Sequence, residues 1–219
     1  SYSSDIFVPS TFTTLMAKFT PFLLVAYVTS MLASDILNAK KKITILSQTD
    51  DLTGLLNMRA FNTILDREIA TASRYGHPFT IIMIDVDGLK EVNDRFGHVA
   101  GSELVRVIAN AIKNSVRGTD VIARYGGDEF VALMTHTSTE HARYAAERIR
   151  VAIDNTAFDM EGQRISSTVS IGIASYPECV DVAGKVLGKA DVALYRSKNT
   201  GRNRVTYYDE ALENEQAYA

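Results

Sequence analysis

The sequence predicts an α+β fold, in which helices flank a mostly antiparallel central sheet in a ferredoxin-like arrangement and a further helix precedes the domain. Three observations support this. Several segments carry apolar residues at helical spacing. Short apolar runs bounded by turn residues alternate with these segments and are typical of strands. The 219 residues suffice for one domain of about 150–170 residues plus an extension.

The composition argues against several classes of protein. The net charge of −3 argues against a general nucleic-acid binder, which needs a basic surface. A single cysteine, Cys179, excludes an internal disulfide and indicates a reducing compartment, so we expect a cytoplasmic domain. Four histidines without ligand-like spacing argue against a zinc site. Any metal should therefore be oxygen-ligated Mg²⁺ or Mn²⁺.

Residues 1–48 form a distinct N-terminal segment. The stretch from Phe19 to Ser34 is uncharged and mostly apolar, and Lys40, Lys41 and Lys42 follow it. Two interpretations stay open. This is the end of a transmembrane span with its cytoplasmic flank, which would anchor the full-length protein in the inner membrane, or it is a core helix of an upstream sensor domain. The chain begins with serine rather than methionine and has no signal-peptide pattern, so we expect it to be part of a longer protein.

The end of this segment is predicted to be a signalling helix. Ile36, Ile43 and Leu46 have the spacing of a two-stranded coiled coil, although the run is short. A turn-rich junction then opens the main domain, which we place at residues 49–208, and residues 209–219 form a polar C-terminal tail.

The first half of the main domain predicts a helix, a strand and two more helices. Asn57 is expected to cap a helix that ends before Gly76. The predicted elements are a helix at 58–75, a buried strand at 79–87, a short helix containing Asn93 and Asp94 that breaks at Gly97-His98, and a helix at 100–115. Asp85 is unusual, because a carboxylate at the end of a buried strand is costly unless it is paired or bound to metal.

The second half predicts a hairpin followed by alternating helices and strands. Gly126-Gly127 reads as a tight turn with φ > 0 between strands 121–123 and 130–134. Ser138 or Thr139 is expected to cap the next helix. The remaining predicted elements are a helix to residue 154, a strand at 165–174, a helix at 182–197 and a strand at 204–208.

The hairpin turn is followed at once by Asp128 and Glu129. Bare glycine backbone beside paired acids suits a phosphate with a divalent metal, and the alternative is a solvated surface turn. Asp85 ends a neighbouring central strand, so a metal pair could lie between these carboxylates. A reaction on a nucleoside triphosphate is the chemistry that these groups fit.

Phosphate and base contacts are also available in the sequence. The backbone from Val86 to Leu89 passes from a strand into a helix N-terminus, which can cradle phosphate. Lys198 and Arg202 could hold the terminal phosphates, or could merely complement a helix dipole. Asn93 can both donate to and accept from a base, and its alternative role is that of a plain surface residue.

Four motifs in order, DDLTGLLNMRAF (50–61), IDVDGLKEVNDRFGH (84–98), RYGGDEF (124–130) and ADVALYRSKNTGRNRV (190–205), make the chain similar to GGDEF-domain nucleotidyl cyclases, the bacterial diguanylate cyclase family. The resemblance covers about residues 50–208. It implies a nucleotidyl-cyclase-like fold and a signalling transferase that acts as a homodimer. Such an enzyme condenses two GTP molecules into cyclic di-GMP and releases pyrophosphate.

The resemblance also implies the roles of individual residues. Two Mg²⁺ or Mn²⁺ ions per site would be held by Asp85, the carbonyl of Val86, Asp128 and Glu129, and Asp128 would be the general base with Glu129 beside it. The residues implied in substrate binding are Gly88, Leu89, Lys90, Asn93, His98, Ser102, Gly126, Gly127, Lys198 and Arg202. Those implied in inhibition by product are Arg117, Asp120 and Arg148.

Ser102 departs from the family pattern, in which an aspartate accepts from the guanine edge. A serine hydroxyl donates as well as accepts, so it tolerates adenine. We therefore expect relaxed base selectivity, with ATP accepted beside GTP and cyclic GMP-AMP formed beside cyclic di-GMP; a subgroup with serine here resembles such hybrid cyclases. The alternative is neutral drift, with guanine still read by Asn93.

Two other functions remain open. One is a catalytically inactive domain that senses a nucleotide, and the other is a purely structural dimerisation module. Inactive domains of this type lose the hairpin acids, whereas Asp85, Asp128 and Glu129 are all present here. The sequence thus favours an active cyclase.

Overall fold

The computed structural model describes residues 9–46 and 48–209 and divides the chain into two compact units, residues 1–47 and 48–219. The first unit is built on a single helix, α1 (Pro9–Leu46), which contains Pro21. Its stretch Thr13–Leu37 has 25 residues and a mean hydropathy of 1.5, which is long and apolar enough to cross a membrane. The helical stretch is thus longer than the uncharged run that the sequence singles out.

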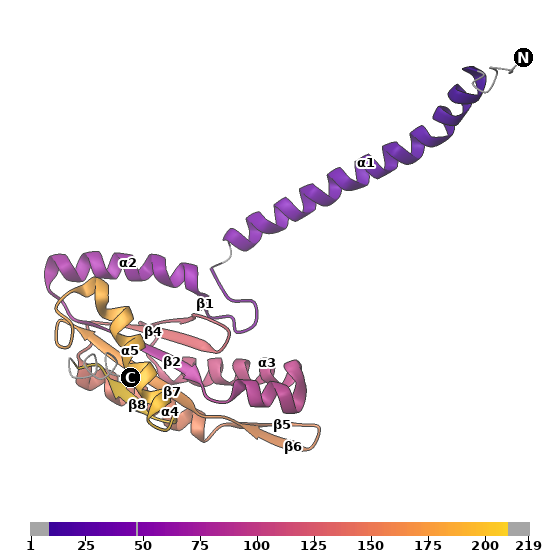
Figure 1. The fold of residues 1–219 in the computed structure, drawn as a ribbon. Coiled ribbons are helices and arrows are strands. Elements are labelled where there is room, and N and C mark those ends of the chain that lie inside the picture. The colour runs from indigo at the N-terminus through magenta and orange to yellow at the C-terminus, as the bar shows by residue number, and fades with distance from the viewer. Residues whose placement is uncertain (1–8, 47, 210–219) are drawn as a thin grey trace, which may run out of the picture. The chain divides into compact units, whose positions relative to one another are not determined.

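The second unit is built around a six-stranded sheet with the order β1-β3-β4-β2-β7-β8 (Figure 1). The central pairs are antiparallel, and the two edge pairs, β1–β3 and β7–β8, are parallel. The strands are β1 (Leu56–Asn57), β2 (Phe79–Val86), β3 (Val121–Arg124), β4 (Glu129–Thr135), β7 (Val169–Tyr176) and β8 (Val205–Tyr207). The predicted α+β fold with a mostly antiparallel sheet is confirmed.

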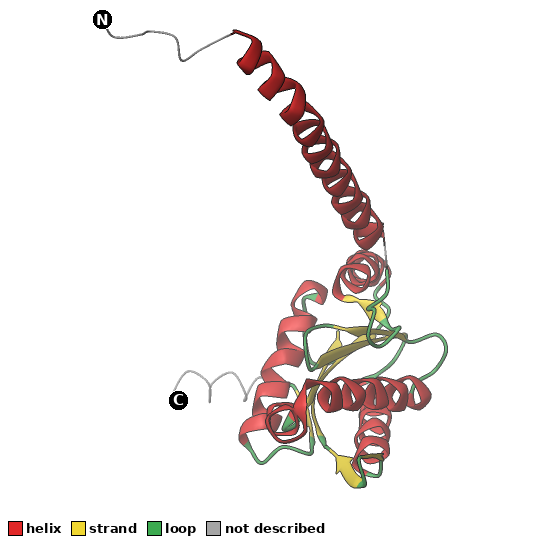
Figure 2. Cartoon of the chain, turned by 90° about the vertical axis from the view of Figure 1, so that its right-hand side faces the viewer, coloured by secondary structure: helices red, strands yellow, loops and turns green. Residues whose placement is uncertain are grey.

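Helices cover both faces of this sheet, as Figure 2 shows. On one face α2 (Met58–Tyr75) and α5 (Val186–Asn199) enclose one apolar core, and on the other α3 (Leu89–Ser115) and α4 (Thr139–Asp154) enclose a second. Because β2 lies between the two cores, all eight of its residues are buried. This explains the continuous apolar run and makes Asp85 an exception on that strand.

The predicted helix boundaries are partly confirmed. The side chain of Asn57 accepts a hydrogen bond from the backbone N–H of Ala60 at the start of α2, and Gly76 ends the helix with a φ of 72°. At α4 the cap prediction is wrong in its mechanism. Ser138 makes no side-chain cap bond, and the N–H of Thr139 donates instead to Glu178 from a distant loop.

One further prediction about the elements is confirmed, and two features of the structure differ from the prediction. The predicted break at Gly97 is present as a kink with φ 83° and ψ 164° inside α3. The strand predicted at 165–174 is wrong as one element, because β6 (Gln163–Ser166) pairs with an unpredicted strand, β5 (Ala157–Met160), in a separate two-stranded sheet. A short 3₁₀ turn, η1 (Ala183–Lys185), precedes α5.

Candidate functional site

The hairpin between β3 and β4 places the paired acids at the rim of the sheet. The backbone N–H groups of Tyr125 and Gly126 both donate to the carbonyl of Glu129 and close the loop. The expected positive φ at the glycines is wrong, since neither Gly126 nor Gly127 adopts one. A Cβ at Gly126 would lie 2.8 Å from Oε2 of Glu129, so a side chain there would push the end of that carboxylate aside. The missing side chain thus makes room for one of the acids.

Arg124 holds the tip of this hairpin, and sequence reasoning gave it no role. Its Nη2 donates to the carbonyl of Gly127 at 2.6 Å, and its Nη1 lies 3.2 Å from Oδ2 of Asp50. Partial burial alone would raise the pKa of Asp50, but hydrogen bonds from Thr53 and the charge of Arg124 outweigh it and lower that pKa. Asp50 therefore stays ionised and tethers the hairpin to the start of the domain.

Asp85 lies at the centre of the charged cluster and is only 8% exposed. It is directly opposite Glu129 in the β2–β4 register, and Lys198 Nζ lies 2.7 Å from its Oδ2. Burial raises the pKa of Asp85 from 3.8 to about 6; Lys198 opposes this shift, and the charges of Asp128 and Glu129 add to it. Three carboxylates and one ammonium group therefore share one locality at the end of β2.

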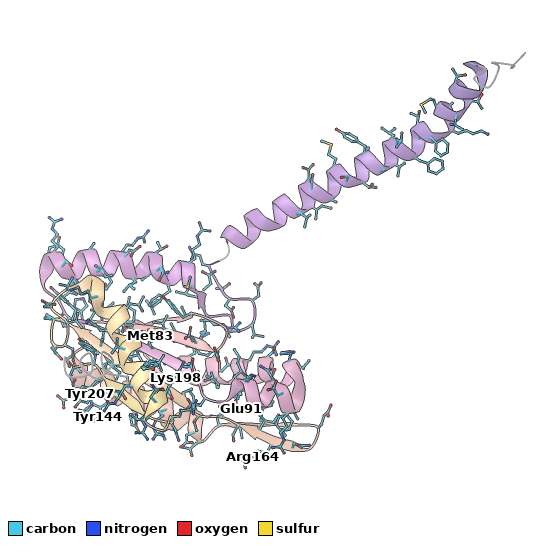
Figure 3. All side chains as sticks on the ribbon, viewed as in Figure 1. Met83, Glu91, Tyr144, Arg164, Lys198 and Tyr207 are labelled. Atoms are coloured by element: carbon cyan, nitrogen blue, oxygen red, sulfur yellow. The ribbon has the colours of Figure 1, made fainter. Side chains whose placement is uncertain are left out.

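The position of Lys198 follows from how α5 packs on β7. A Cβ at Gly172 would lie 2.1 Å from the backbone nitrogen of Leu194, so only glycine allows the helix to approach this closely. The next turn is fixed by Ser197, whose hydroxyl donates to the carbonyl of Ile171 at 2.7 Å. Figure 3 marks Lys198 on α5, where this helix crosses the strands. The ammonium group thus reaches the end of β2.

The donor set at this rim fits a hard divalent cation. Within the part of the chain that the structure describes, no three His, Cys, Asp or Glu side chains converge as a ready-made metal cluster. The charges of Asp128 and Glu129 nevertheless act on Asp85 and add to the rise in its pKa that burial causes. Carboxylates together with the carbonyl of Val86 are the oxygen ligands that Mg²⁺ and Mn²⁺ prefer.

Next to the hairpin lies a cavity of about 470 Å³. The side of α3 and the hairpin tip form its walls. It brings together predicted residues that are far apart in the sequence, Leu89, Lys90, Asn93, His98, Ser102, Gly127 and Asp128, and its other lining residues are Leu52, Asp94, Gly101, Val105 and Arg124. A volume of this size is in the range of small-molecule sites.

Gly101 belongs to this cavity and was not singled out from the sequence. A Cβ at this position would lie 2.0 Å from Oδ1 of Asn93. The kink at Gly97 returns the chain so that residue 101 faces the earlier turn of α3. Any side chain at Gly101 would therefore displace the Asn93 amide from the cavity wall.

The other predicted substrate residues lie around the end of β2. Gly88 caps α3 with a φ of 71°, which places the N-terminus of that helix directly after the strand. Arg202 lies in the turn after α5, and its Nε is 4.0 Å from Oδ1 of Asp87. The two predicted phosphate-binding cations thus stand beside two carboxylates of the same strand end, Asp85 and Asp87.

The predicted inhibition residues also converge. The backbone N–H of Arg117 donates to Oδ2 of Asp120, and the N–H of Asp120 returns to the carbonyl of Arg117, which closes the RGTD turn. From α4, Nε of Arg148 donates to the carbonyl of Ser115 at 2.8 Å. Arg148 therefore lies at the foot of this turn.

A larger cavity of about 680 Å³ lies elsewhere, between α4, β8 and the loop after β7. Tyr144 and Tyr207, both marked in Figure 3, line it together with Arg143, whose guanidinium lies 5.2 Å from the Tyr207 ring centre. None of the residues predicted for the site lines this cavity. Its size alone therefore does not make it the reaction site.

Comparison with known proteins gives the family. Residues 47–204 match the family described as diguanylate cyclase, GGDEF domain. Diguanylate cyclase A of Treponema denticola is 38% identical over 164 residues, which are 74% of this chain and 44% of that protein. Diguanylate cyclase DosC of Escherichia coli is 42% identical over 164 residues, 74% of this chain and 35% of that protein. The chain thus spans less than half the length of these relatives.

A solved structure points the same way. The GGDEF domain of DgcB from Caulobacter crescentus, in complex with c-di-GMP, superposes with a TM-score of 0.70 at 34% identity, over 74% of this chain and 95% of that one. The match covers the unit that holds the hairpin, the strand-end acids and the cavity. The chain belongs to the GGDEF domain family.

Proposed function

We propose that this chain is a dinucleotide cyclase of the diguanylate cyclase type, which converts two GTP molecules into cyclic di-GMP and two pyrophosphates. The observation that carries the proposal is the buried Asp85 opposite the Asp128-Glu129 hairpin, with Lys198 in contact and a cavity of about 470 Å³ alongside. The relatives named diguanylate cyclase support the same reaction.

The residues that would hold two Mg²⁺ or Mn²⁺ ions are Asp85, the carbonyl of Val86, Asp128 and Glu129. When bound, the cations would neutralise charge on the triphosphate and on the attacking oxygen. Lys198 now compensates Asp85 at 2.7 Å. Asp85 is one of the residues that would hold a cation, and Lys198 beside it would bind a terminal phosphate.

The remaining residues position the nucleotide and remove the proton from its ribose 3′-hydroxyl. Asp128 accepts the proton of the ribose 3′-hydroxyl, which attacks the α-phosphorus of the other nucleotide as the bond to pyrophosphate breaks. Glu129 lies beside it, and Arg202 binds the β- and γ-phosphates with Lys198. The N–H groups of Gly88, Leu89 and Lys90 would donate to the phosphates. The absence of side chains at Gly126 and Gly127 would let the backbone there come close to the phosphates.

Base choice belongs to the cavity. Asn93 offers both a donor and an acceptor to guanine, His98 lines the same cavity, and Ser102 can serve guanine or adenine. We therefore propose that ATP is accepted beside GTP and that cyclic GMP-AMP forms beside cyclic di-GMP.

The proposed reaction needs two copies. Each domain holds one triphosphate and faces the other domain, so the active form is a homodimer. α1 would bring the two copies together, and its stretch Thr13–Leu37 would anchor them in the inner membrane with the catalytic unit in the cytoplasm. The turn at Arg117 and Asp120, with Arg148, would bind the product and limit its level.

The test is a product assay with equal GTP and ATP and Mg²⁺, analysed by mass spectrometry, with Asp128→Asn as the control. We expect cyclic di-GMP and cyclic GMP-AMP from the parent chain and neither from the variant. Cyclic di-GMP alone would overturn the relaxed base choice. Bound GTP without pyrophosphate release, even from a crosslinked dimer, would make the domain a nucleotide sensor.

A further inference from the structure

Asp87 is a second buried carboxylate at the end of β2, with a side chain only 8% exposed. Both of its oxygens are already engaged. Oδ1 accepts from the hydroxyl of Ser170 at 2.7 Å, and Oδ2 accepts from the hydroxyl of Thr168 at 2.7 Å and from the backbone N–H of Asn203 at 3.1 Å. A carboxylate so occupied is poorly placed to bind a metal and well placed to hold a neighbouring segment.

The segment that it holds is the turn after α5. Arg202 and Asn203 have φ angles of 56° and 46°, the left-handed region that residues other than glycine rarely adopt. Such a conformation costs free energy and persists only where surrounding contacts enforce it. Here the N–H of Arg202 donates to the carbonyl of Ser197, and the N–H of Asn203 donates to Asp87.

A further contact secures this turn from α4. Nη1 of Arg150 donates to Oδ1 of Asn203 at 2.8 Å. By contrast the side chain of Arg202 itself is 65% exposed. The backbone of the turn therefore fixes where this side chain starts, and its printed ion pair is with Asp87.

We propose that Asp87 is a positioning residue, which fixes this turn in its left-handed conformation and thereby aims Arg202 at the terminal phosphates of the nucleotide. This inference rests on the proposed function, because it assumes that Arg202 binds those phosphates. Asp87 acts through the backbone N–H of Asn203 and through Nε of Arg202, 4.0 Å from its Oδ1, and touches no reacting atom.

The test measures binding, which needs neither turnover nor a dimer. A GTP analogue with a methylene between its α- and β-phosphates is titrated calorimetrically into the whole chain at saturating Mg²⁺. We expect Asp87→Asn to weaken binding about tenfold, the factor that 1.4 kcal/mol represents. The matched control is Asp191→Asn, which removes one exposed carboxylate from α5 and none of the contacts described for this turn, and it should bind as the parent does.

A double variant separates positioning from a general loss of structure. In the Arg202→Ala background, Asp87→Asn should cost little further affinity, because the side chain that Asp87 positions is gone. Additive losses would overturn the proposal. If Asp87→Asn does not fold, Asn203→Ala replaces it, since this change removes the contact with Arg150 and leaves Asp87 in place. The Asn203→Ala variant should bind the analogue about threefold more weakly, which corresponds to less than the 1.4 kcal/mol of a tenfold change. Unchanged affinity would count against the inference.

The outcomes also distinguish this inference from the proposed function. If the parent chain fails to bind the analogue, the proposed function itself fails. If the parent binds and Asp87→Asn binds equally well, only the positioning role fails. If Asp87→Asn merely raises the Mg²⁺ concentration that binding requires, with normal affinity at saturation, Asp87 is a metal ligand and the positioning role is wrong.

Discussion

Among the predicted site residues that the structure describes, Asp85 is the one whose pKa is clearly shifted. Its carboxylate is buried between one ammonium group and two further acids, and its pKa is raised to about 6 by burial first and by those acids second. A buried carboxylate of this kind lowers the free energy of unfolding of the metal-free protein, and the same carboxylate can bind a cation. Its cost is therefore measurable in the metal-free protein.

The first prediction concerns that cost and its sign. Because the pKa of Asp85 is higher in the folded chain, the folded state binds the proton more tightly, and the free energy of unfolding falls as pH rises from about 4 to about 6 and then levels off. Asp85→Asn lacks this contribution. In EDTA, urea unfolding should show the stability of Asp85→Asn relative to the parent increasing by about 1–2 kcal/mol across that window. A difference that stays constant would contradict the assignment.

The second prediction concerns the base. Ser102→Asp restores a carboxylate acceptor beside Asn93 in the cavity. Because a hydrogen bond to a charged group contributes about 1.5–3 kcal/mol, preference for GTP over ATP should rise about tenfold or more. Competition between the two nucleotides, followed by mass spectrometry of the products, measures this. Ser102→Ala is the control and should not gain selectivity.

At the scale of elements, the third prediction tests how α5 is seated. Gly172→Ala would place a methyl group against the backbone of Leu194, which cannot rotate away, so we expect a loss of at least about 1–3 kcal/mol in unfolding free energy and weaker nucleotide binding through Lys198. Gly188→Ala, in α5 itself, meets nothing within 4 Å. That control should be neutral or stabilising by up to about 1 kcal/mol. Equal melting temperatures for Gly172→Ala and Gly188→Ala would contradict the close approach of α5 to β7.

Some elements could be predicted from sequence because their patterns encode burial directly. α2 has an apolar face and a capping asparagine, and β2 is apolar throughout because both of its faces are covered. β5 and β6 lack such a pattern. Their hairpin exposes Asp159 and Arg164, and it packs on the core under α3 through Phe158, Met160 and Ile165.

The chemistry of the site was predictable, whereas its mechanical supports were not. The acidic and basic side chains can be identified as candidates from their residue types and from the local motifs that contain them. Arg124 and Asp87 act through partners 74 and 116 residues away, which no local pattern reveals. Gly126 shows a related failure: its sequence context indicated a left-handed turn, whereas it has no positive φ and its absent side chain leaves the end of Glu129 unobstructed.

At the scale of the whole molecule, the fourth prediction separates binding from turnover. Removing residues 1–47 leaves the compact unit that contains every site residue. We expect this fragment to melt like the intact domain and to bind the GTP analogue normally. Its turnover at low concentration should fall more than about tenfold, because nothing then raises the effective concentration of the second copy. Fusion to a parallel coiled coil should restore turnover, and full activity of the dilute fragment would exclude the role given to α1.

The cavity beside Asn93 is lined within a single catalytic unit, and the hairpin acids stand at its edge. In the proposed condensation, such a unit carries only half of the reactants. At low concentration the rate of product formation should then rise as the square of the concentration of the chain. It should become linear in that concentration once the chains are dimeric. If α1 lies in a membrane, crowding within that plane sets the output, and a cell can adjust signal production by clustering chains without altering a single residue of the site.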